Sequence, residues 1–208
     1  MINLKSLFFV LGCAAVAVSP AAIVITPGPG NFPGDENVLF NDPGLLNDGP
    51  LVQGISNQTQ FLFNYFDAGE DLHVNGGQAL IEPFSGDGYQ ALTWEFDDDN
   101  VAFLTYIVNL DVFNAAGDGQ VTWYGTTWGG TEVNLGTFDI GSAGANWFRF
   151  STTEGDFIDQ LRFTSTVDLE NTQQHRVGGA QVVPEPASMA ALALGFGAIA
   201  SRIRRRKK

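Results

Sequence analysis

The chain has 208 residues, with 23 Asp and Glu against 10 Lys and Arg, one Cys and two His. A single cysteine excludes an intramolecular disulfide and a cysteine-based metal cluster, and a chain of this length can bury a sizeable core without either. The net charge of −13 disfavours binding to nucleic acid and to an anionic membrane surface.

The first 21 residues have the order of a secretory signal peptide. Lys5 is the only charged side chain before the apolar stretch at residues 7–18, and small residues follow at two candidate cleavage sites, 15–17 and 19–21. Residues 10–13 partly match a lipoprotein box, although the apolar stretch continues beyond its cysteine. We expect export and cleavage by a signal peptidase, with lipidation of the cysteine as the alternative.

The next segment, residues 22–55, is rich in Gly, Pro, Asn and Asp and is predicted to be mostly loop, with one strand at residues 38–40. Between Ala22 and Val183 the chain has 22 Asp and Glu, three Arg and no Lys, which gives this body a net charge of −19. Such acidity favours solubility outside the cell, and it also favours calcium uptake.

From residue 60 onward, short apolar runs alternate with turn residues, which is the pattern of antiparallel strands. Residues 90–96 alternate apolar and polar side chains, and residues 101–113 carry six apolar side chains on one face. Residues 97–100, between these runs, are predicted to form a hairpin turn. Further strands are predicted at residues 61–66, 79–81, 121–124, 133–138, 147–151, 158–165 and 175–177.

No part of the body has a convincing helical period, so about eight to ten short strands predict an all-β domain. The expected fold is a single antiparallel β-sandwich that is jelly-roll-like, with a barrel as the alternative. It is expected to span residues 56–182, between the loop-rich segment and a C-terminal tail at residues 183–208. The predicted core consists of Phe63, Leu92, Trp94, Phe96, Leu104, Tyr106, Val108, Leu110, Phe148, Phe150, Leu161 and Phe163.

A catalytic site would rest on the carboxylates of Glu95 and Asp97, which lie two apart and share a face if both are on a strand. Residues 95–99 are similar to a Glu-x-Asp-x-Glu strand of one group of jelly-roll glycosidases. However, the last position is Asp99, and the motif continues into a turn. We therefore predict a protein that is not an enzyme.

A binding site would rest on exposed aromatic rings, which stack on the faces of sugars. Trp94, Trp123 and Trp147 lie on predicted strands and are expected in the core, whereas Trp128 lies at a predicted loop tip, residues 126–130. Trp128 is therefore the candidate for ligand contact.

Metal sites have weaker support in the sequence. Asp and Asn gather at residues 41–42, at residues 97–100 and at Asp111, Asn114 and Asp118, but none has the spacing of an EF-hand. Asx side chains also cap turns, so no metal or other cofactor is predicted, and calcium is kept as the alternative. The two histidines, His73 and His175, have no visible third ligand.

The C-terminal tail combines an apolar run with a basic end. Residues 187–201 have no charged side chain, and a helix of about 17 residues reaches about 25 Å, short for a lasting span of a bilayer core about 30 Å thick. We predict a transmembrane helix that serves as a temporary anchor. Positive charge beside such a helix stays cytoplasmic, so the body lies outside the cytoplasm. The membrane stop consists of Arg202, Arg204, Arg205, Arg206, Lys207 and Lys208.

A short rigid motif, Val183, Pro184, Glu185 and Pro186, precedes this apolar run. Together the three parts resemble a PEP-CTERM sorting signal. The resemblance implies a Gram-negative bacterium, recognition by an exosortase in the inner membrane, and removal of the tail near the motif. It also implies a connection with exopolysaccharide or biofilm matrix.

The sequence thus predicts an exported β-sandwich protein that passes transiently through the inner membrane to the cell surface or the extracellular matrix. Its expected partners are signal peptidase, an exosortase and exopolysaccharide, which it would bind or organise, and nucleic acid is not among them. A polysaccharide-active glycoside hydrolase with a jelly-roll fold is the alternative.

Overall fold

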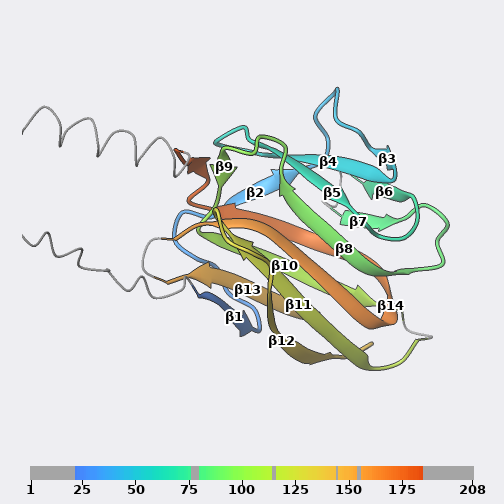
Figure 1. The fold of residues 1–208 in the computed structure, drawn as a ribbon. Helices are drawn as coiled ribbons and strands as arrows, with labels where there is room; N and C mark the ends of the chain where they lie inside the picture. Colours follow the sequence, from blue (N-terminus) through green and yellow to red (C-terminus); the bar gives the residue numbers. More distant parts are fainter. Residues whose placement is uncertain (1–21, 76–79, 114–115, 144, 154–155, 185–208) are drawn as a thin grey trace, which may run out of the picture.

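The computed structural model describes residues 22–75, 80–113, 116–143, 145–153 and 156–184, and every regular element within these ranges is a strand (Figure 1). The predicted signal peptide and transmembrane helix lie outside them, and the described residues include no helix long and apolar enough to cross a membrane. The strands are β1 (Ile23–Pro27), β2 (Glu36–Leu39), β3 (Asp48–Gly49), β4 (Leu51–Ser56), β5 (Leu62–Phe66), β6 (Leu72–Asn75), β7 (Leu80–Pro83), β8 (Tyr89–Phe96), β9 (Val101–Ala102), β10 (Thr105–Val112), β11 (Gly119–Thr127), β12 (Val133–Ile140), β13 (Asn146–Thr152), β14 (Ile158–Gly178) and β15 (Gln181–Val182).

The strands form an antiparallel sandwich whose two layers share the long strand β14, drawn in orange in Figure 1. In one layer, the first part of β14 lies between β11 and β8, and the order continues through β5 and β4 to β2. In the other layer, the last part of β14 pairs with β10, which is followed by β13 and β1. On its other side the last part of β14 pairs with β7 and with β2, so β2 pairs with both β4 and β14. A register shift between Thr164 and Leu169 marks the change of layer, as is common where a strand turns a corner between sheets.

Large aromatic side chains from both layers fill the space between them. The ring of Trp94 on β8 lies 5.3 Å from the ring of Tyr106 on β10 and 5.8 Å from that of Trp123 on β11, measured between centroids. All three side chains are fully buried. Burying such rings removes a large apolar area from water, which stabilises the sandwich.

A chain of buried hydrogen bonds crosses this aromatic core. The hydroxyl oxygens of Tyr65 and Tyr106 lie 2.9 Å apart, and that of Tyr106 lies 2.9 Å from Nδ1 of His175. The other ring nitrogen of His175 lies 3.1 Å from the hydroxyl of Thr172. Burial lowers the pKa of His175 to about 3, so its ring is neutral in the folded protein at ordinary pH.

The predicted antiparallel β-sandwich is confirmed, and all but one of the predicted core side chains are buried. The exception is Leu104, which is half-buried because β9 ends at Ala102 and β10 begins only at Thr105. Phe103 is buried in its place and forms a β-bridge with Ile158. The predicted single strand at residues 101–113 is therefore two strands with a break between them.

The predicted hairpin at residues 97–100 is wrong. β8 pairs with β5 and β14, whereas β9 pairs with β15 and β10 lies in the other layer. Residues 97–100 therefore connect the two layers. The tip is capped locally, because the side chain of Asp98 accepts a hydrogen bond from the backbone N–H of Asn100 at 2.9 Å.

Two further expectations differ from the structure. The segment predicted to be mostly loop with one strand contains β1, β2, β3 and most of β4, and Val38 and Val52 from it are fully buried. Trp147 is half-buried and not part of the core, because on β13 it alternates with the buried Phe148 and Phe150. The period of two would have placed Trp147 on the outer face.

Candidate functional site

A hollow of about 270 Å³ lies beside the end of β8, the end of β11 and the start of β14. Among the described residues, its lining is acidic and aromatic and includes no cation: Glu95, Phe96, Asp99, Trp128, Gly129 and Asp159. A half-buried aromatic ring beside several hydrogen-bonding groups is the usual composition of a small-molecule or glycan site.

Trp128 stands in the turn that joins β11 to β12, as its predicted position at a loop tip required. The backbone N–H of Trp128 donates to the carbonyl of Phe157 at 2.9 Å, and that of Gly130 donates back to Thr127 at 2.8 Å. Gly129 has φ of 68°, a left-handed conformation that glycine adopts without strain. The indole Nε1–H is buried and has no hydrogen-bond partner among the described residues, as is also true of the core indoles of Trp94 and Trp123.

A β-bulge on β14 directs the side chain of Asp159 to the hollow. Thr126 pairs with Gln160 and Thr127 with Ile158, so Asp159 is the extra residue on β14. A bulge re-aims a side chain and is common beside functional sites. Partial burial, together with the nearby charges of Glu95 and Asp99, raises the pKa of the Asp159 carboxyl to about 6. The sequence contained no signal for this bulge, and Asp159 was missed as a site residue.

Glu95 lies on β8 directly opposite Gln160, whose side-chain amide donates to its carboxylate at 2.6 Å. The predicted partner carboxylate, Asp97, lies beyond the end of β8 and does not line the hollow. Its carboxylate instead accepts a hydrogen bond from Asn64 at 2.9 Å. The structure therefore groups Glu95 with Asp99 and Asp159, not with Asp97.

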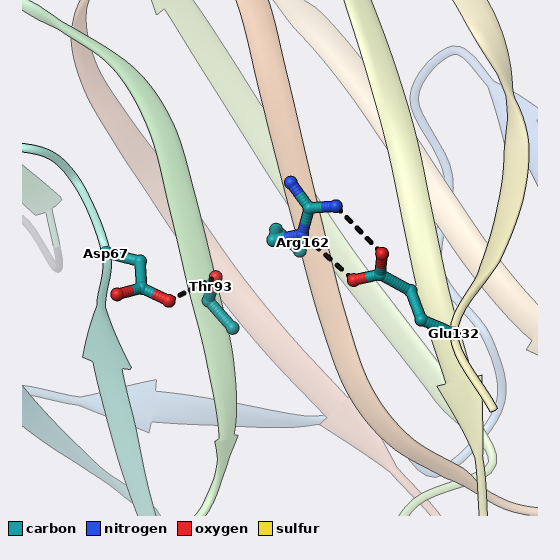
Figure 2. Close-up of polar contacts among 4 residues, drawn as sticks. All are labelled: Asp67, Thr93, Glu132 and Arg162. Carbon is teal, nitrogen blue, oxygen red and sulfur yellow. Dashed lines mark hydrogen bonds and ion pairs between the residues drawn. The ribbon is translucent and has the colours of Figure 1, made fainter. Parts of the chain in front are cut away.

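An ion pair fastens the turn that carries Trp128 to the sheet, as Figure 2 shows. Arg162 on β14 donates from Nε and Nη2 to the two carboxylate oxygens of Glu132, at 2.9 and 2.8 Å, and Glu132 lies in the same β11–β12 connection as Trp128. The guanidinium also lies 4.0 Å from the ring centroid of Tyr124, and its hydrogen bonds lower the pKa of Glu132. Sequence inspection gave no indication of this pair.

The outer face next to this pair is polar. Thr93 on β8 pairs directly with Arg162, and its hydroxyl lies 3.5 Å from the carboxylate of Asp67 (Figure 2). One row further, amide and carboxylate side chains of Gln160, Glu95 and Asn64 lie opposite one another on three adjacent strands. The hollow thus continues into a surface of hydrogen-bonding groups.

The described residues include no group of three or more His, Cys, Asp or Glu side chains positioned to hold a metal ion. Asp118, from one predicted calcium cluster, accepts from the backbone N–H of Ser142 at 3.0 Å, which is a loop-capping contact; Asn114 lies outside the described residues. His73 is exposed beside Asp48, whereas His175 is buried in the core. The absence of a cofactor stays the prediction, with calcium as its alternative.

The predicted sorting motif begins where the described chain ends. β15 pairs with β9, and the backbone N–H of Val183 donates to the carbonyl of Asn100 at 2.7 Å. Pro184 follows, and Glu185, Pro186 and the six basic residues of the membrane stop lie outside the described residues.

A family model described as the PEP-CTERM protein-sorting motif matches residues 182–206. The chain carries a PEP-CTERM sorting motif. The predicted resemblance is confirmed, and the motif marks this PEP-CTERM chain as an exported protein that an exosortase sorts.

Among solved structures, a protein titled "Carbohydrate binding module family29" aligns with this chain, with 11% sequence identity and a TM-score of 0.32. The alignment covers 78% of this chain and 88% of that chain. So remote a likeness says nothing about the ligand of the PEP-CTERM chain. No curated protein matches its sequence.

Proposed function

We propose that this protein has no enzymatic activity and binds or organises exopolysaccharide at the cell surface or in the extracellular matrix of a Gram-negative bacterium. The observation that carries the proposal is the hollow, which brings the indole of Trp128 together with the carboxylates of Glu95, Asp99 and Asp159. Indole rings stack on the apolar faces of sugars, and carboxylates accept hydrogen bonds from hydroxyl groups.

The charge of the hollow supports this class of ligand over others. No cation of the described residues lines it, and the body has a net charge of −19, so a nucleic acid or another polyanion would be repelled. A neutral or amine-bearing glycan meets no such barrier.

The experiment is a glycan array probed with the purified body, with and without Ca²⁺, followed by titration of any ligand found. Trp128→Ala should weaken binding by about 1–3 kcal/mol, by analogy with bases stacked on aromatic side chains. Trp147→Ala is the matched control, because Trp147 is also half-buried but lies on β13, away from the hollow. Equal binding by both variants and the unmodified protein would exclude the hollow as the ligand site.

Arg162 is a positioning residue in this proposal, because it holds the Trp128 turn through Glu132. Arg162→Lys keeps the charge but loses the bidentate geometry, so it should weaken glycan binding with little loss of stability. If Arg162→Lys lowered stability and left the affinity unchanged, the pair would have no role in placing Trp128.

A glycoside hydrolase is the second candidate, and one observation favours it. Asp159 has a pKa raised to about 6 beside the carboxylate of Glu95, and a protonated acid next to a second carboxylate is the arrangement of a glycosidase. Release of reducing ends from a bound glycan, abolished by either Asp159→Asn or Glu95→Gln, would overturn the non-enzymatic assignment. Unchanged ligand over long incubation would support it.

A further inference from the structure

The body remains paired with its own C-terminal segment up to the sorting motif. Gln181 and Val182 of β15 pair with Ala102 and Val101 of β9, and Val183 donates to the carbonyl of Asn100. β9 and β15 lie side by side in Figure 1. Because pairing continues to Val183, the chain has no flexible linker between the domain and Pro184.

The hollow lies next to β9, the strand that pairs with the C-terminal segment. Asp99, which lines it, immediately precedes the Asn100 carbonyl that holds Val183. On the other side, Asp159 follows Ile158, which exchanges backbone hydrogen bonds of 3.0 and 2.6 Å with Phe103, next to β9. Both walls of the hollow are therefore attached directly to the strand that holds the tail.

The sequence limits how far this end of the domain can stand from a membrane. Only four residue steps separate Val183 from Ala187, the first residue of the apolar run, and a chain of four residues reaches at most about 14 Å when fully extended. The interfacial layer of a bilayer takes up about 5–8 Å of that distance. The remaining space is too narrow for a hydrated polysaccharide chain to approach from that side.

We propose that the end of the domain formed by β9, β15 and the hollow faces the membrane while the sorting tail is attached, and that removal of the tail opens the hollow to polymers. This rests on the proposed function for the identity of the ligand and on the predicted membrane segment at residues 187–201 for the anchor. Exosortase processing would then do more than release the protein, because it would also make the site accessible. The still-anchored precursor would be prevented from binding matrix polymer beside the inner membrane.

The test measures access to the hollow without any ligand. Asp99→Cys places a thiol at the hollow, and Gln120→Cys places one at the opposite end of β11, about 20–25 Å away along the strand. Both are made in the exported chain, residues 22–208, which lacks the signal peptide and Cys13 and is the full chain of this test, and both are reconstituted in vesicles of phosphatidylethanolamine and phosphatidylglycerol. Each is compared with the same variant ending at Pro184, using a polymer-linked maleimide and, separately, N-ethylmaleimide.

We expect the polymer-linked reagent to label Asp99→Cys several-fold more slowly in the full chain than in the chain ending at Pro184, whereas Gln120→Cys reacts equally in both. N-ethylmaleimide should react equally at Asp99→Cys in both chains, which shows that the thiol itself is reactive. Inserting a flexible linker of about 12 residues between Val183 and Pro184, with a mean reach of about 20 Å, should restore labelling by the polymer. Labelling of Asp99→Cys that is indifferent to the tail, or equally slow at Gln120→Cys, would overturn the proposal.

Discussion

The buried imidazole of His175 should make the protein lose stability in mild acid. Burial lowers its pKa to about 3, against about 6.5 in an unfolded chain, so between these values the unfolded state binds more protons than the folded one. The contribution of the neutral ring is complete above pH about 6.5 and is lost as the pH falls toward 3. The difference in pKa corresponds to about 4–5 kcal/mol, a large share of the stability of a typical domain.

The assay is urea unfolding of the body at several pH values, with His175→Gln as the reference. Carboxylates titrate in both proteins, so the difference in unfolding free energy between them isolates the imidazole. This difference should fall by about 1.4 kcal/mol for each pH unit between about 6 and 3.5. Tyr106→Phe, which removes the hydroxyl next to Nδ1, is the control that keeps the titrating group. A difference that stays constant from pH 7 to pH 4 would show that His175 is not held neutral by burial.

Three other changes test the site, the packing and the tail. Asp159→Asn should stabilise the body by about 1–2 kcal/mol at pH 8 and by little at pH 4. The reason is that the raised pKa of this half-exposed carboxyl means that the folded state resists its ionisation, and urea unfolding at the two pH values checks this. Gly54→Ala should cost about 1–3 kcal/mol, since a Cβ there would lie 2.6 Å from Val38 and 2.7 Å from Phe40, and an unchanged midpoint would contradict this packing. A chain ending at Pro184 should melt at the same temperature as the longer body because β15 is retained, whereas a chain ending at Gly179 should melt at a lower temperature. Equal melting temperatures for the chains ending at Pro184 and at Gly179 would mean that the β9–β15 pair contributes no stability.

The strands and the core could be predicted from the sequence because they depend on a local pattern. A period of two marks β8 and β10, and it places Trp94 and Tyr106 on the buried face. Pairing partners could not be predicted in this way. The turn after β8 looked like a hairpin, but β14 is long enough to pair with β8 in one layer and with β10 in the other.

The same difference between local pattern and long-range pairing decides which residues of the candidate site could be predicted. Trp128 could be found because two glycines follow it and break the strand pattern, and the sorting motif could be found because its three parts are contiguous in sequence. Asp159 could not, because its position depends on a bulge set by pairing with β11. Arg162 and Glu132 meet across 30 residues of sequence, a distance at which charge patterns carry no information about contact.

The side chains of the hollow lower the stability of the fold. Glu95, Asp99 and Asp159 are held close enough for the charges of Glu95 and Asp99 to oppose the ionisation of Asp159, and no cation in the described part of the chain lines the hollow to offset them. Packing requires none of this, since the core is complete without these side chains. Groups that cost stability and that a ligand would satisfy are commonly found at functional sites, and here they lie at the end of the domain from which the sorting tail leaves.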